Sequence, residues 1–362
     1  MSKASKYQIS AIKYRPLDFE NVIGQKHITD TLKQAISQKK VAKSFLFCGP
    51  KGVGKTTCAR ILARKLNNVI ELDSAYELDA ASNNSVDDIK DIIKKLNYLP
   101  FCGKYNIYII DEVHMLSHSA FNAFLKVLEE PPSHVIFILA TTEKNKVLPT
   151  VLSRCQIYDF KHINIKNLMK ALIKICTLEN VEYEKDALLL IAENSEGSLR
   201  DALSSFDRLK LFSNNKISRK IVAKQLGILD IQYCLQITEL IIDKNIIDKN
   251  ILKTLLYFEK LIKKGINRNC FINHIAAHFR NLLVLKNNGT IQFFNYSEKF
   301  KNRLYAQSKK VSSNFLIKAL IICEKTDNFI RKSYNKRLTI EITLVKLIEL
   351  NFSMRKEEYE NL

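Results

Sequence analysis

The feature that most constrains this chain is the glycine-containing motif GPKGVGKT at Gly49–Thr56. It matches G-x-x-x-x-G-K-[ST] and stands between an apolar segment, Ser44–Cys48, and a stretch with helical periodicity. Glycines let backbone N–H groups turn inward around phosphate oxygens, and the following helix directs its N-terminus at the same anion. Lys55 supplies a positive charge to the β- and γ-phosphates, and the Thr56 hydroxyl can ligate Mg²⁺. The motif therefore predicts a strand–loop–helix unit that binds Mg²⁺-ATP and hydrolyses it. The predicted nucleotide-binding residues of this loop are Gly49, Pro50, Lys51, Gly52, Val53, Gly54, Lys55, Thr56 and Thr57.

A second acidic motif completes the predicted site. The apolar run Ile107–Ile110 is followed directly by Asp111 and Glu112, at the point where the strand should end. Asp111 is expected to hold the Mg²⁺ shell, and Glu112 to act as the general base that polarises the attacking water. The alternative is that both carboxylates cap the next helix, which is improbable beside a phosphate-binding loop.

Short apolar runs alternate with helical stretches up to about residue 160, which predicts a parallel α/β sheet flanked by helices. The expected strands are Ser44–Cys48, Val69–Leu72, Asn106–Ile110, Val135–Ala140 and Gln156–Phe160. After this point the spacing is helical, with a break at Asn194–Gly197. We expect an α/β nucleotide-binding domain over residues 1–162, a small helical lid over 163–225 and an all-α domain over 226–362.

Composition limits the function classes. No run of roughly 18 apolar residues is present, and the first residues lack the apolar core of a secretory signal, so a cytoplasmic protein without a membrane span is expected. The eight cysteines form no C-x-x-C pair, which fits a reducing compartment. The net charge of +20 is compatible with a nucleic-acid partner, but Lys, Asn and Ile are abundant along the whole chain, so the charge decides nothing alone.

With these motifs in place, the sequence resembles the AAA+ clamp-loader ATPases, and among them the gamma/tau subunits of bacterial DNA polymerase III. Beyond the two motifs above, the matching blocks in family order are Lys13–Pro16, Val22–Gln25, Leu78–Ser82, Ile110–Leu116, Asn122–Lys126, Leu128–Pro132, Ala140–Thr142, Ser153–Cys155 and Gly197–Ala202. They cover about the first 205 residues. The resemblance implies an AAA+ domain, a lid, and a C-terminal collar through which subunits assemble.

The resemblance also implies roles for single residues. Tyr14–Pro16 and Val22–Gln25 resemble the segments around the adenine, which adds Arg15, Pro16, Val22 and Ile23 to the nucleotide site. Thr142 resembles the polar sensor of the γ-phosphate, with Thr141 as the alternative. Arg154 resembles an arginine finger that reaches the neighbouring subunit's nucleotide, and Arg200 resembles the lid arginine that closes on its own.

The implied partners are the other subunits of a hetero-pentameric loader, the sliding clamp, and primed DNA bound without sequence preference. For DNA, the candidate is the helix that opens at Asn83–Ser85, with Lys90 beyond it, although an ordinary N-cap explains those residues equally well. For the clamp, the candidate is the apolar loop Tyr98–Phe101, a kind of loop that also packs on its own domain.

Two departures from the family stand out. Gamma/tau subunits usually carry a four-cysteine zinc module, but the interval Asn67–Leu78 contains no cysteine, so we predict no zinc. The sequence also ends at residue 362, where a tau form would continue, so tethering of helicase and polymerase is not expected of it.

The leading hypothesis is thus an ATP-hydrolysing subunit of a clamp loader, part of the DNA polymerase III holoenzyme. A different AAA+ DNA motor, such as a branch-migration helicase, is the second hypothesis. A scaffold subunit in which ATP is only structural is the third.

Overall fold

The computed structural model of the chain describes residues 8–69, 75–101, 103–227, 231–243, 247–286, 298–330 and 332–360. Internal contacts divide the chain into two compact units, Met1–Arg219 and Lys220–Leu362. Within the described residues, no helix is both long and apolar enough to cross a bilayer. The three-domain division at residues 162 and 225 stays a prediction.

The first unit is built on a parallel five-stranded sheet in the order β2-β3-β4-β1-β5. Its strands are β1 (Ser44–Cys48), β2 (Ala75–Asp79), β3 (Asn106–Asp111), β4 (Val135–Thr141) and β5 (Gln156–Asp159). The interior strands β3, β4 and β1 are buried along almost their whole length, because helices cover both faces of the sheet. Four of the predicted strands are thus confirmed within a residue at each end.

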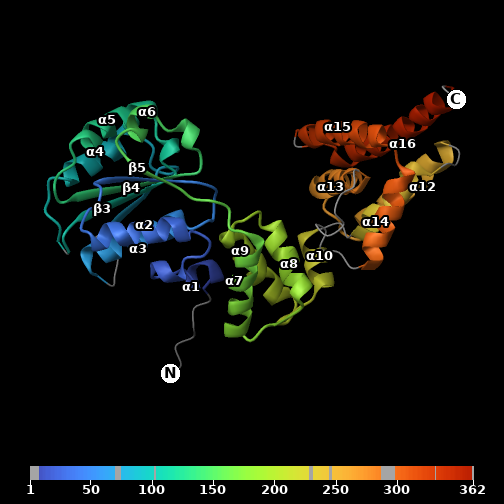
Figure 1. Cartoon of the computed structure of the whole chain (residues 1–362). Helices are drawn as coiled ribbons and strands as arrows, with labels where there is room; N and C mark the ends of the chain where they lie inside the picture. The colour runs from blue at the N-terminus through green and yellow to red at the C-terminus, as the bar shows by residue number, and fades with distance from the viewer. Residues whose placement is uncertain are drawn as a thin grey trace. The chain divides into compact units, whose positions relative to one another are not determined.

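Alternate residues of each strand serve two separate hydrophobic layers. Phe45 and Phe47 of β1 pack against α2 (Lys26–Ser37) and α3 (Lys55–Asn67). Leu46 and Cys48 point to the other face, which packs against α4 (Val86–Lys95), α5 (His118–Glu129) and α6 (Pro149–Leu152). Figure 1 shows the two helical layers on opposite sides of the sheet.

The edge of the sheet differs from the prediction. The sequence favoured a strand at Val69–Leu72; only Val69 lies within the described residues, and it is not in a strand. The strand that pairs with β3 is β2, five residues long and in register from Ala75 opposite Ile107 to Asp79 opposite Asp111. Because the residues of β2 are exposed or half-buried, they lack the continuous apolar run by which the interior strands are recognised.

Short elements at the N-terminus and in the loops, and a helical lid, complete the first unit. They are α1 (Ser10–Lys13), η1 (Phe19–Asn21), η2 (Val113–Met115), η3 (Lys144–Lys146), α7 (Ile165–Leu178), β6 (Glu182–Tyr183), α8 (Lys185–Asn194), α9 (Leu199–Phe212) and β7 (Lys216–Ile217). The break predicted after Asn194 is confirmed, since α8 ends there and Glu196 and Gly197 both have positive φ. The two-stranded parallel pairing of β6 with β7 was not predicted.

Every secondary-structure element described in the second unit is a helix. Its helices are α10 (Arg219–Leu226), which spans the boundary, α11 (Ile231–Ile242), α12 (Ile247–Lys263), α13 (Arg268–Lys286), α14 (Glu298–Lys310), α15 (Ser313–Ile330) and α16 (Lys336–Glu360). One apolar core joins α11 to α16, with Phe258, Phe271, Phe279 and Phe315 among its fully or almost fully buried side chains. The predicted fold class, a helix-covered parallel sheet followed by helical regions, is confirmed.

The centre of the sheet should be intolerant of truncation. Phe137 is fully buried in β4, edge-on to Phe124 of α5 at a centroid distance of 5.0 Å. Phe137→Ala is expected to lower the free energy of unfolding by about 3–5 kcal/mol, because it leaves a cavity between sheet and helix. Chemical denaturation measures this. Phe101→Ala is the matched control at a fully exposed side chain and should change stability by less than about 0.5 kcal/mol. Equal losses would contradict the assigned core.

Candidate functional site

The glycine-rich loop joins β1 to α3 at the C-terminal edge of the sheet. Its first residue is tied to the neighbouring strand, since Gly49 N–H donates to the Thr141 carbonyl at 3.1 Å. Gly54 is the N-cap of α3 in a left-handed conformation, with φ 107°. The first turn of α3 therefore directs its unpaired N–H groups toward the loop, an arrangement suited to an anion.

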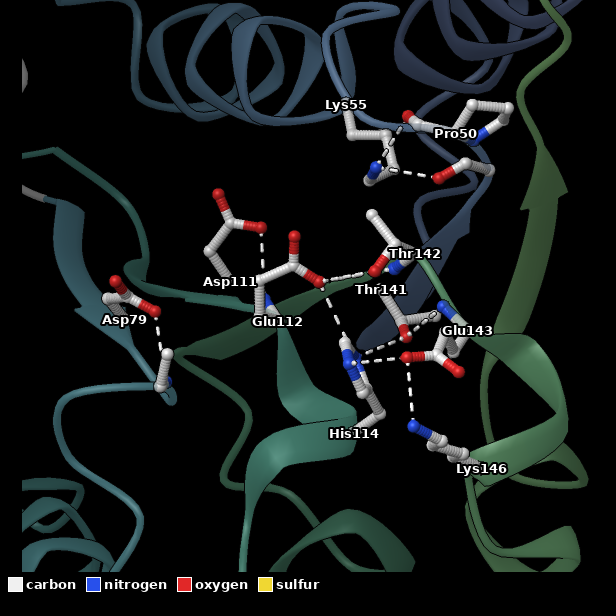
Figure 2. A network of polar contacts seen from close by, with 12 residues as sticks. Pro50, Lys55, Asp79, Asp111, Glu112, His114, Thr141, Thr142, Glu143 and Lys146 are labelled. Atoms are coloured by element: carbon white, nitrogen blue, oxygen red, sulfur yellow. Dashed lines mark hydrogen bonds and ion pairs between the residues drawn. The ribbon is translucent and has the colours of Figure 1, made fainter. Parts of the chain in front are cut away.

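Lys55 is buried at the start of α3, with 6% of its surface exposed. Its ammonium donates to the carbonyl oxygens of Gly49 and Pro50, at 2.7 and 2.8 Å (Figure 2). Burial lowers the pKa of Lys55, while the nearby carboxylates of Glu112 and Asp111 act in the opposite direction. Phosphate oxygens in place of the two carbonyls would form stronger hydrogen bonds with this desolvated ammonium, because both partners would then be charged.

Thr56 and Asp111 form an oxygen donor pair suited to Mg²⁺. The Thr56 hydroxyl donates to Asp111 Oδ2 at 2.7 Å, so the start of α3 and the end of β3 meet at one point. Mg²⁺ is usually bound by one or two protein oxygens together with water and substrate phosphates, and this pair fits that demand. In the part of the chain that the structure describes, no group of three His, Cys, Asp or Glu side chains could hold a metal ion.

Glu112 is held in place by the end of β4. It has a left-handed backbone, with φ 48° and ψ 44°, which is uncommon for a residue with a Cβ. Its Oε2 accepts hydrogen bonds from the Thr142 backbone N–H at 3.2 Å and from the Thr142 hydroxyl at 2.9 Å (Figure 2). Backbone and side chain together aim the carboxylate at the same edge of the sheet as the phosphate-binding loop.

A histidine whose side chain is only 6% exposed lies next to this carboxylate, and the sequence predicts no role for it. His114 Nδ1 lies 3.4 Å from Glu112 Oε2 and 3.0 Å from the Thr141 hydroxyl. His114 Nε2 lies 3.5 Å from Glu143, which pairs with Lys146 at 2.9 Å (Figure 2). The only hint in the sequence was the position of His114 two residues after Glu112, which gives no direction for the ring.

A cavity of about 300 Å³ extends from the loop between the sheet, the N-terminal segment and the lid. It is lined by Ile9, Ala11, Ile12, Tyr14, Arg15, Pro16, Val22, Ile23, Lys51 through Thr57, Asp111, Glu112, Ile163, Leu199, Arg200, Leu203 and Ser204. Most of the predicted nucleotide-binding residues are thus brought together. The sequence did not predict the lining residues Ile9, Ala11, Ile12, Ile163, Leu199, Leu203 and Ser204. In the lid, the i, i+4 spacing of Leu199 with Leu203 and of Arg200 with Ser204 was the one signal that these residues share a helix face.

The lid is joined directly to the phosphate-binding loop. The Gly52 carbonyl accepts hydrogen bonds from the backbone N–H groups of Leu199 and Arg200, at 3.1 and 3.4 Å. Arg200 itself lines the cavity, close enough to Arg15 to contribute to the lowered pKa of the Arg15 guanidinium, for which burial is the main cause. Two arginines near the cavity walls provide positive charge for a polyanionic ligand.

Several predicted residues lie beside this cavity rather than in its wall. Gly49 and Pro50 hold Lys55 through their carbonyls, and Thr142 holds Glu112. Thr141 is fully buried and turned to His114, so of the two candidate sensors only Thr142 contacts the predicted base.

Arg154 also lies apart from the cavity wall. Its guanidinium pairs with Glu129 at 2.7 Å and donates to the Thr150 carbonyl at 2.8 Å.

The candidate contacts for DNA and clamp lie on α4 and the loop after it. Ser85 caps α4 in a capping box with Asp88, and Lys90 pairs with Asp87 at 3.2 Å. Two aspartates in the first turn disfavour a phosphate there, so these contacts favour the N-cap interpretation. Tyr98, Leu99 and Phe101, in contrast, are strongly exposed apolar side chains.

Parallel sheet, phosphate-binding loop, acidic pair and lid together define an AAA+ P-loop ATPase. Among solved structures, a variant of RuvB from Thermotoga maritima shares the fold, with a TM-score of 0.50 and 23% identity over 64% of this chain and 80% of that one. Three families match in sequence: "DNA polymerase III, delta subunit" over residues 68–164, "DNA polymerase III clamp loader subunit, ATPase lid domain" over 167–208, and "DNA polymerase III subunits gamma and tau domain III" over 217–362.

Curated relatives are similar over nearly the whole chain. DNA polymerase III subunit gamma of Buchnera aphidicola subsp. Baizongia pistaciae is 34% identical over 95% of this chain and 98% of its own length. Subunit tau of Bacillus subtilis is 36% identical over 95% of this chain, which spans 63% of that protein. Subunit tau of Escherichia coli is 39% identical over 66% of this chain and 40% of its own length. The chain belongs to the gamma/tau family of DNA polymerase III clamp-loader subunits, as the resemblance implied.

The junction of loop and lid can be tested at Gly52. Gly52 and Gly54 both have positive φ, at 75° and 107°, so alanine is strained at either position. A Cβ on Gly52 would also lie 2.1 Å from Ser198 Oγ, whereas nothing lies within 4 Å of one on Gly54. Gly52→Ala should therefore lower the unfolding midpoint, measured by circular dichroism, clearly more than Gly54→Ala. Equal shifts would show that the lid does not pack on the loop in this way.

Proposed function

We propose that this chain is the ATP-hydrolysing motor subunit of a DNA polymerase III clamp loader, which opens the sliding clamp and loads it on primed DNA. The observation that carries the proposal is the meeting of Thr56, Asp111 and Glu112 at one edge of the sheet, beside Lys55. Membership in the gamma/tau family supports the assignment to a loader rather than to another AAA+ motor. The likeness to RuvB supports the fold alone.

In the proposed reaction, the loop and Lys55 hold the phosphates of ATP. Thr56 and Asp111 hold Mg²⁺, which neutralises charge on the β- and γ-phosphates when bound. Glu112 accepts the proton of the attacking water, and Thr142 keeps the carboxylate aimed at it. Arg200, from the lid, contacts the γ-phosphate of its own subunit, and Arg154 completes the site of the adjacent subunit.

The proposed partners follow from these roles, since Arg154 acts on the nucleotide of an adjacent subunit. Several subunits assemble through the helical second unit, and ATP binding brings them to the form that holds the clamp open. The exposed loop with Tyr98, Leu99 and Phe101 is proposed to face the clamp. The chain is proposed to act in the cytoplasm, on primed DNA and without sequence preference.

The role of Glu112 separates a motor from a scaffold. Glu112→Gln should bind ATP as the parent chain does but turn it over about 10²-fold more slowly or worse, because the amide cannot accept the proton. The measurement is phosphate release by the assembled loader with clamp and primed DNA. Glu182→Gln is the same substitution at an exposed lid position and should leave the rate unchanged. Unchanged turnover in Glu112→Gln would remove Glu112 from the base role, and no turnover by the parent assembly would favour the scaffold hypothesis.

The trans role of Arg154 predicts that assembly controls the rate. Arg154→Ala should lower ATP turnover of the assembled loader on the order of 10³-fold, because an arginine finger stabilises charge in the transition state. Binding of a non-hydrolysable ATP analogue to the isolated chain should stay within about twofold, since Arg154 lies outside that chain's own cavity. Arg208→Ala, at an exposed lid arginine, is the control. Fast turnover by the isolated parent chain, insensitive to partners and DNA, would contradict the mechanism.

A further inference from the structure

The N-terminal strap, which we define as residues 9–16, forms one wall of the cavity. Ile9, Ala11, Ile12 and Tyr14 line it with apolar and aromatic surface, followed by Arg15 and Pro16. The phosphate-binding loop forms the opposite, polar end of the same cavity. A wall of this composition suits the flat, weakly polar base of a nucleotide and not its phosphates.

The strap is anchored to the lid by hydrogen bonds. Ser10 is buried, and both its backbone N–H, at 2.7 Å, and its hydroxyl donate to the carboxylate of Asp207 in α9. Lys13 and the Tyr14 hydroxyl both donate to the carboxylate of Glu179 at the end of α7. Two successive turns of the strap are thus held by two acidic residues of the lid.

Glu179 is the centre of this anchor. A third donor, Lys210 of α9, reaches its second oxygen at 2.7 Å. Hydrogen bonds from Lys13, Lys210 and Tyr14, in that order of effect, lower the pKa of Glu179 to about 2. The carboxylate is therefore ionised at neutral pH and serves strap and lid at once.

The same lid helix touches the opposite end of the cavity. Leu199 and Arg200, at the start of α9, donate their N–H groups to Gly52 of the phosphate-binding loop. Asp207 and Lys210 stand two to three turns further along that helix. Helix α9 thus contacts the phosphate-binding loop at its start and the strap further along, through two separate sets of hydrogen bonds.

We propose that Glu179 and Asp207 are positioning residues that hold the strap against the lid, so that the nucleotide base is bound only by a correctly placed lid. The proposal rests on the proposed function in one respect, namely that the ligand is ATP. It adds that the lid is linked to the nucleotide base through the strap, and to the phosphates through Gly52 and Arg200. The affinity for a ligand that has phosphates but no nucleotide base should then not depend on Glu179.

The test compares two ligands on the full chain, a non-hydrolysable ATP analogue and inorganic tripolyphosphate, each with Mg²⁺ and titrated by calorimetry. Glu179→Gln should weaken binding of the analogue by about fivefold or more, the lower end of typical coupling between sites. Tripolyphosphate binding should stay within about twofold. The control is Glu182→Gln, whose exposed carboxylate pairs with Lys216 in the lid and should leave both affinities within about twofold.

Asp207→Asn provides a second, independent variant if Glu179→Gln does not fold, and the same selective loss is expected of it. Equal weakening of both ligands would reduce the two carboxylates to a general structural role and overturn the proposal. An unchanged affinity for the analogue would overturn it as well. If the parent chain bound the analogue no better than tripolyphosphate, the base-binding wall would fail with the proposal, while ATP turnover of the assembled loader would still test the motor function separately.

Discussion

Parallel pairing of β3 and β1 with β4 is the constraint on which the rest of the site depends. The register places Cys48 of β1 beside Thr141 of β4, and the parallel direction brings the C-terminal end of β3 to the same edge of the sheet. From this follow the Gly49 contact with Thr141, the Thr56 contact with Asp111 and the Glu112 contact with Thr142. Three segments far apart in the sequence thus meet at one edge, namely the loop with Thr56, the acidic pair at the end of β3, and the end of β4 that holds both, because parallel strands end where their crossover helices begin.

At that edge, Glu112 is held by more than its own conformation. A left-handed backbone at a residue with a Cβ costs free energy and persists where the surroundings determine it. Thr142 donates hydrogen bonds to its carboxylate, and the half-buried His114 lies next to that carboxylate, in contact with Thr141 and Glu143. The last member, Lys146, is exposed on η3. A continuous set of polar contacts therefore leads from the surface of the domain to the predicted base.

The lid is fixed at both ends of the cavity by different chemistry. At the loop, two backbone N–H groups of α9 bond the Gly52 carbonyl, which leaves no room for a Cβ there. At the strap, hydrogen bonds from Ser10, Lys13 and Tyr14 to the carboxylates of Asp207 and Glu179 hold the lid. Hydrogen bonds to an ionised carboxylate are shorter and stronger than neutral ones. A nucleotide bound in this cavity, as proposed, would contact the loop, the strap and the lid and would thereby link three parts of the fold.

By itself, the sequence determined those features that depend on neighbours along the chain. The loop at Gly49–Thr56, the carboxylates of Asp111 and Glu112 after an apolar run, the interior strands and the break after Asn194 are local patterns with local physical causes. Tertiary structure decided the rest. It turned Thr142 and not Thr141 to Glu112, placed His114 next to this predicted base, and put the edge strand at Ala75–Asp79, where partial exposure hides the apolar pattern of a strand. It also joined Ser10 to Asp207 across 197 residues and Tyr14 to Glu179 across 165. Such contacts follow from the packing of whole elements, and no periodicity within either segment records which side chain it will meet.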